Sequence, residues 1–123
     1  MELLKLEDYQ NLDGKKVIQY FAEISKIPRK SGEEKKIREY LETFAKERNL
    51  NYVKDEYDNI IIYKPATKGR ENEETLAFQA HTDMICEKDA GVQHDFSKDP
   101  IVLYKEGDNI TANGTTLGAD NGI

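Results

Sequence analysis

The sequence of 123 residues contains a single cysteine, Cys86, and no long apolar run. One cysteine excludes an internal disulfide and is typical of proteins in a reducing compartment. No stretch reaches the roughly 20 apolar residues that span a bilayer. Charged residues at positions 2, 5, 7 and 8 also interrupt any signal-peptide pattern at the start. We therefore expect a cytoplasmic protein without membrane contact.

An excess of positive charge is also absent, because 18 Lys and Arg stand against 24 Asp and Glu, for a net charge of −6. Binding to nucleic acid needs clustered Lys and Arg that neutralise phosphates. The lysines here lie next to glutamates, as in residues 33–36, which is typical of a solvated helix face. No nucleic-acid partner is expected. The hydrophobic content of 37% and charged content of 34% are those of a globular domain with its own core.

The first half of the chain has the pattern of two helices. Apolar residues at helical spacing predict a helix over residues 12–27, with Asp13 as its cap. Ser31 and Glu34 have the spacing of a capping box and predict the start of a second helix, which continues to about Asn49. We interpret both helices as scaffold.

Short strands are predicted in the remainder of the chain. Residues 51–55 and 59–63 flank a turn and indicate a hairpin, and residues 101–104 and 109–112 indicate a second strand pair. The apolar run within residues 75–80 predicts a buried strand. Helices and strands in this order favour an α/β layer structure with two helices and a mixed sheet.

His81 and Asp83 follow this predicted strand directly. In an extended segment, residues two apart point to the same side, and ligands of open α/β sheets commonly bind at the carboxyl ends of strands. A histidine that binds metal usually donates its second N–H to a carboxylate, which fixes its tautomer. The pair is therefore a candidate metal ligand with its partner, or a base with the group that orients it. A surface histidine bonded to a nearby acid gives the same pattern.

Residues 114–122 surround one acid, Asp120, with three glycines and other small residues. Glycine permits unusual backbone angles and close approach of other groups. An aspartate in such a turn can present both carboxylate oxygens and bridge two cations. An ordinary Asn-Gly turn is the simpler interpretation. A phosphate-binding loop is disfavoured because no Gly-Lys-Ser/Thr ending follows.

Together these segments closely resemble the aminoacyl-histidine dipeptidases (Xaa-His dipeptidases, or peptidase D) of the M20 metallopeptidase family. The resemblance extends over nearly the whole chain and rests on several ordered segments: Ile27-Pro28 with Ser31 and residues 33–34, then residues 58–67, 79–84, 94–101 and 114–123. The ordered combination is far more specific than any one segment.

The resemblance implies a role for each candidate residue. His81 would be a terminal ligand to one zinc ion, Asp83 would orient His81, and Asp120 would bridge two zinc ions. The reaction would be hydrolysis of a small peptide, an Xaa-His dipeptide, with roughly 3.5–4 Å between the metals. Cobalt or manganese could occupy a site of imidazole and carboxylate ligands as well as zinc.

The family's other metal ligands and its general base, a glutamate of a Glu-Glu pair, would follow Ile123. Residues 1–123 therefore correspond to the N-terminal part of a zinc-dependent exopeptidase-like catalytic domain, without the lid domain through which full-length relatives often form homodimers. We expect this chain alone to be inactive and to bind metal at most weakly. His94 and Cys86 are not expected to be ligands.

Two alternatives stay open. The chain could be a non-catalytic binding or assembly domain that keeps only this part of the fold. It could also be part of a related enzyme of the same family, such as a tripeptidase or a deacylase. Downstream sequence would test the first alternative and a substrate panel the second.

Overall fold

The computed structural model describes residues 1–119. In chain order the elements are β1 (Glu2–Leu3), a short 3-10 helix (Leu6–Asp8), α1 (Lys15–Ser25), α2 (Lys35–Glu47), β2 (Asn51–Lys54), β3 (Ile60–Tyr63), β4 (Leu103–Glu106) and β5 (Asn109–Ala112). The strands form two antiparallel sheets, β1-β4-β5 and β2-β3. The predicted α/β class with two helices is confirmed, but the strands described in residues 1–119 form antiparallel sheets and not the predicted mixed sheet. None of the helices described in residues 1–119 is long and apolar enough to cross a membrane.

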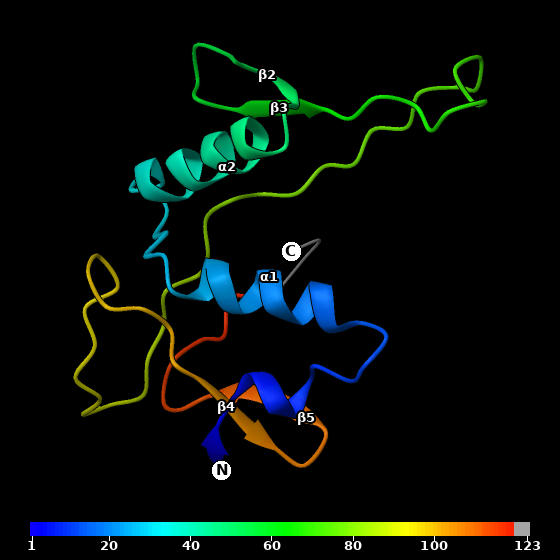
Figure 1. Cartoon of the computed structure of the whole chain (residues 1–123). Helices are drawn as coiled ribbons and strands as arrows, with labels where there is room; N and C mark the ends of the chain where they lie inside the picture. Colours follow the sequence, from blue (N-terminus) through cyan, green and yellow to red (C-terminus); the bar gives the residue numbers. More distant parts are fainter. Residues whose placement is uncertain (120–123) are drawn as a thin grey trace.

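The first of two parts, which we call the sheet unit, contains α1, the sheet β1-β4-β5 and residues 29–31, 81–89 and 114–118 (Figure 1). Its core is formed by Phe21 of α1, Met84, and the neighbouring residues Ile101 and Leu103. The backbone N–H of Ile101 also donates to the carbonyl of Ser25 at 2.9 Å. The chain after α1 and the chain entering β4 are thereby joined.

The second part, the hairpin unit, contains α2, the hairpin β2-β3 and residues 64–80 (Figure 1). The carboxylate of Glu42 on α2 joins helix and hairpin, because it accepts from Lys54 Nζ at 2.8 Å and from the hydroxyl of Tyr52 at 3.3 Å. Asp55 accepts from the backbone N–H of Asn59 at 2.9 Å and holds the turn. Both predicted strand pairs are confirmed, β2-β3 here and β4-β5 in the sheet unit.

The two helices begin differently from the prediction. Helix α1 is preceded by Gly14 and has no side-chain cap, so the predicted role of Asp13 is wrong. Helix α2 begins at Lys35 with Glu34 as its N-cap, also without a side-chain cap. The capping box of Ser31 and Glu34 is therefore wrong as well. The Ser31 hydroxyl donates instead to the Asp83 carboxylate, a contact that the local pattern could not indicate.

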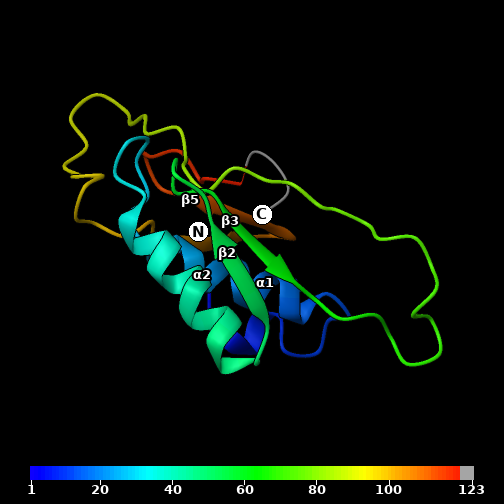
Figure 2. The same ribbon diagram turned by 90° about the horizontal axis from the view of Figure 1, so that it is seen from above.

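The buried strand predicted over residues 75–80 is wrong. These residues have no regular structure, and the side chains of Leu76 and Phe78 are 78% and 94% exposed. A strand needs a neighbour for its backbone hydrogen bonds, and no strand described in residues 1–119 pairs with this segment. It is instead part of a long extended connection that projects from the hairpin unit before returning to α1 (Figures 1 and 2). His81 and Asp83 therefore follow an irregular segment and not a strand.

Candidate metal centre

His81 and Asp83 lie together, as the sequence predicted. His81 Nδ1 is 2.9 Å from Asp83 Oδ1 and 2.8 Å from the Asp83 carbonyl oxygen. Both of these partners can only accept, so Nδ1 must carry the hydrogen. In the neutral ring the lone pair then lies on Nε2, which is the arrangement of a histidine that binds metal through Nε2.

The Asp83 carboxylate is held at both of its oxygens. Oδ1 accepts from His81, and Oδ2 accepts from the hydroxyl of Ser31. The Ser31 hydrogen bond and, more weakly, the His81 contact hold the pKa of Asp83 below its usual value, against the opposing effect of burial. The side chain is therefore an anion at neutral pH, as required of a group that orients a ligand and raises its basicity.

Arg29 lies beneath the site and is almost fully buried, with 2% of its surface exposed. Its Nη1 donates to the carbonyl oxygens of Thr82 at 3.4 Å and of Asp83 at 3.2 Å. Its Nη2 donates to the carbonyl of Gly118 at 2.6 Å. One side chain thus joins two segments that both carry candidate ligands.

The turn before Asp120 packs closely against this arginine. Gly118 has a φ of +75°, and a Cβ at this position would lie 2.7 Å from Arg29 Nη2 and 3.1 Å from Met84 Sδ. Only glycine satisfies both the backbone angle and the space. Thr116 fixes the same turn through its hydroxyl, which donates to the carbonyl of Ile85 at 2.7 Å. Asp120 itself lies outside the described residues.

The donor set fits part of a zinc site. The side chains of His81 and Asp83 are 36% and 33% exposed, so the pair is accessible to an ion. An imidazole in a fixed tautomer, supported by a carboxylate, suits zinc. Within residues 1–119, however, no group of three or more His, Cys, Asp or Glu side chains is arranged to hold a metal. The described residues therefore supply one ligand and its orienting partner.

Other candidate residues have structural roles. Burial raises the pKa of the Cys86 thiol, which disfavours the thiolate that metals bind. The His94 ring packs edge-on against Phe96, with 4.4 Å between the ring centroids. Sequence reasoning did not identify Arg29 as part of the site and assigned Ser31 to a helix cap. The spacing of these two residues carries no metal-ligand signal, and only the fold brings them to Asp83.

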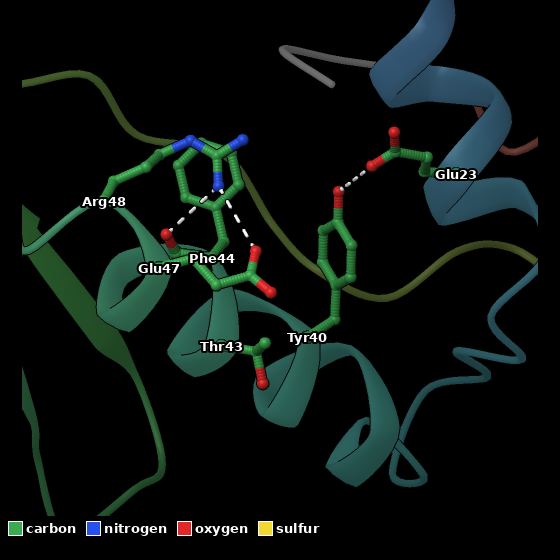
Figure 3. A pocket seen from close by; sticks show the side chains of 6 residues that line it. All are labelled: Glu23, Tyr40, Thr43, Phe44, Glu47 and Arg48. Carbon is green, nitrogen blue, oxygen red and sulfur yellow. Dashed lines mark hydrogen bonds and ion pairs between the residues drawn. The ribbon is translucent and has the colours of Figure 1, made fainter.

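A cavity of about 260 Å³ lies between the two helices and is lined by Glu23, Tyr40, Thr43, Phe44, Glu47 and Arg48 (Figure 3). The Tyr40 hydroxyl donates to Glu23 Oε2 across it at 2.7 Å. The Arg48 guanidinium stacks over the ring of Phe44, with 3.6 Å between the guanidinium carbon and the ring centroid. The Tyr40–Glu23 hydrogen bond joins α2 to α1, so we interpret the cavity as part of a helix–helix contact.

The fold corresponds to that of a class of peptide hydrolases, the dipeptidases. The chain is 48% identical over 103 residues to the cytosol non-specific dipeptidase of Escherichia coli K12, which is 84% of this chain and 21% of that protein. It is also similar to the crystal structure of aminoacylhistidine dipeptidase from Vibrio alginolyticus, with a TM-score of 0.87 and 38% identity over 95% of this chain and 23% of the other. No family model matches the chain.

These similarities confirm the predicted resemblance to aminoacyl-histidine dipeptidases. At 21% and 23%, the chain spans between a fifth and a quarter of the length of the two relatives.

Proposed function

We propose that this chain is part of the catalytic domain of a cytoplasmic dipeptidase that uses two zinc ions. His81 would hold one zinc ion through Nε2, Asp83 would orient the ring, and Asp120 would bridge both ions. The observation that carries the proposal is the 2.9 Å contact between His81 Nδ1 and Asp83 Oδ1, which fixes the tautomer required for binding through Nε2. Cobalt or manganese could replace zinc at ligands of this type.

The residues of this chain have a positioning role in the reaction. Bound zinc polarises the peptide carbonyl and lowers the pKa of the attacking water. Asp83 stays ionised because Ser31 and His81 donate to it, and its charge keeps the hydrogen of His81 on Nδ1, so that Nε2 would be free of hydrogen to bind zinc. The general base and the remaining ligands belong to other parts of a complete enzyme, so residues 1–123 alone are inactive by this proposal.

The proposed substrate is an Xaa-His dipeptide, as for the enzyme named in the Vibrio structure. The name of the Escherichia coli relative, a non-specific dipeptidase, favours a wider range of dipeptides as the second candidate. A panel of Gly-His, Ala-His, Ala-Leu, a tripeptide and an acetylated amino acid separates these options. Equal rates on Ala-His and Ala-Leu would support the wider range, and turnover of only the last two compounds would exclude a dipeptidase.

The test of the metal roles uses the protein that contains this chain, loaded with zinc. We expect His81→Ala to abolish hydrolysis and Asp83→Asn to lower activity or zinc affinity roughly 10–100-fold, as for other groups that orient metal ligands. Lys98→Ala, at an exposed loop position, is the control and should change neither. Full activity of His81→Ala would refute the proposed ligand. Dipeptide hydrolysis by the pure 123-residue chain would refute its proposed incompleteness.

A further inference from the structure

The buried guanidinium of Arg29 donates hydrogen bonds to two separate segments of the chain. Removing a guanidinium from water is costly unless its N–H groups find acceptors. Here Nη1 and Nη2 donate to carbonyl oxygens of two segments, Thr82 and Asp83 on one and Gly118 on the other. The guanidinium is a rigid planar fork, so these bonds fix how far apart the two segments lie.

The main chain of the same region adds a second restraint on the site. The backbone N–H of Met84 donates to the carbonyl of Arg29 at 3.0 Å, and Lys30 and Met84 form a parallel bridge. Residues 29–31 therefore run alongside residues 82–84. The Ser31 hydroxyl can reach Asp83 Oδ2 because of this alignment.

We propose that Arg29 and Ser31 are positioning residues for the candidate metal centre. Arg29 sets the separation between the segment that carries His81 and the turn that leads to Asp120, and Ser31 sets the rotation of the Asp83 carboxylate. The inference rests on the proposed function for its purpose, but its geometry can be tested without metal. Lys30, between the two, is exposed and supplies a matched control.

The first experiment measures segment separation in the metal-free chain by NMR. The Met84 methyl carbon lies 3.2 Å from the position of a Cβ on Gly118, so a nuclear Overhauser effect should join the methyl group to the Gly118 Hα protons. Arg29→Lys keeps the charge but loses the planar fork, and we expect this signal to disappear while the far-UV circular dichroism is kept. Lys30→Met should retain it.

If Arg29→Lys retains the Met84–Gly118 signal at wild-type intensity, Arg29 does not set the separation and the inference is overturned. If the variant unfolds, Arg29→Gln gives the second measurement, because it keeps one planar NH2 group but lacks the second NH2 group that would reach the other segment. An intact signal in folded Arg29→Gln would overturn the inference, and its loss would support it.

The second experiment follows the tautomer of His81 through its ring nitrogens at about pH 8, where an ordinary imidazole is neutral. In the wild-type chain we expect the hydrogen on Nδ1. Ser31→Ala leaves Asp83 Oδ2 without this donor, and we expect the population with hydrogen on Nε2 to increase. Ser31→Thr, which keeps the hydroxyl, should restore the wild-type spectrum. An unchanged tautomer in Ser31→Ala would overturn the role of Ser31.

A third readout separates this inference from the proposed function. In the zinc-loaded protein that contains the chain, chelator competition should show roughly 10-fold weaker zinc binding in Ser31→Ala and Arg29→Lys, with no change in Lys30→Met. If wild-type protein binds no zinc, the proposed function fails, whereas the two NMR results still decide the positioning role. Wild-type zinc affinity in both variants would show that positioning has no consequence for the metal and would overturn its proposed purpose.

Discussion

The sheet unit and the hairpin unit differ in the contacts that stabilise each of them internally, which are long-range in sequence in the first and local in the second. In the sheet unit, Arg29 reaches residues that are 53, 54 and 89 positions away. In the hairpin unit, α2 is joined to β2 by contacts only 10 and 12 positions apart. The described part of the candidate site, His81 with Asp83, lies in the sheet unit, whereas Asp120 is outside the described residues. We therefore expect the geometry of the His81–Asp83 pair to be sensitive to changes in the sheet unit, and the exposed connection over residues 64–80 to tolerate change.

We expect the two units to differ most in how far the truncation of an apolar side chain lowers the free energy of unfolding. Leu103 is 9% exposed in the core of the sheet unit, whereas Leu76 is 78% exposed in the connection. We expect Leu103→Ala to lower the free energy of unfolding by about 2–5 kcal/mol and Leu76→Ala to change it by less than about 0.5 kcal/mol. Urea denaturation of both variants measures this. A cost above about 1 kcal/mol for Leu76→Ala would show that residues 75–80 are packed in solution.

A smaller effect is expected from glycine substitution within the sheet unit. Gly118 and Gly107 both have positive φ, but a Cβ at Gly118 meets Arg29 and Met84, whereas one at Gly107 meets nothing within 4 Å. Both substitutions by alanine carry the backbone cost of about 1–3 kcal/mol. Gly118→Ala should cost about 1–3 kcal/mol more because of the crowding. Equal unfolding free energies for the two variants would show that the Gly118 turn moves away from Arg29 without cost.

Sequence patterns predicted the elements whose stabilising contacts are local. The helices required only apolar periodicity, and the β2-β3 and β4-β5 hairpins required short strands around turns. The pattern failed where the answer depended on a distant segment. Ser31 has the spacing of a helix cap, yet its hydroxyl is used by Asp83, 52 positions away.

Only part of the candidate site was predicted, because sequence patterns indicate local contacts but not distant ones. His81 and Asp83 are two positions apart, so their contact follows from local geometry. Arg29 could not be assigned from its neighbours, because a single arginine after a proline gives no sign of burial. An apolar run such as that over residues 75–80 forms a buried strand only where neighbouring strands pair with it and other elements cover it. The local sequence pattern does not identify those neighbours.

The contact between the two units provides the next test. The Tyr40 hydroxyl on α2 donates to Glu23 on α1 at 2.7 Å. Burial and this glutamate raise the pKa of Tyr40, so the hydroxyl keeps its proton and the bond persists across the neutral range. Tyr40→Phe should lower the free energy of unfolding by about 0.5–1.5 kcal/mol. Tyr57→Phe, at a residue that is 79% exposed, should change it little. No loss in Tyr40→Phe would show that this hydrogen bond does not contribute to the association of the two units.

The smallest expected effect is a pH dependence confined to the hairpin unit. The hydrogen bond from Lys54 lowers the pKa of Glu42 below its usual 4.5. A carboxyl whose pKa is lower in the folded state stabilises it above the usual pKa, and this contribution is lost as the pH falls through the lowered value. Amide hydrogen exchange of β2 and β3 should therefore accelerate, as the pH falls below the usual 4.5 of Glu42, more in wild type than in Glu42→Gln, after correction for intrinsic exchange. The same acid dependence in both proteins would assign the acid sensitivity to other carboxyl groups, because Glu42 is the one titrating group that the variant removes.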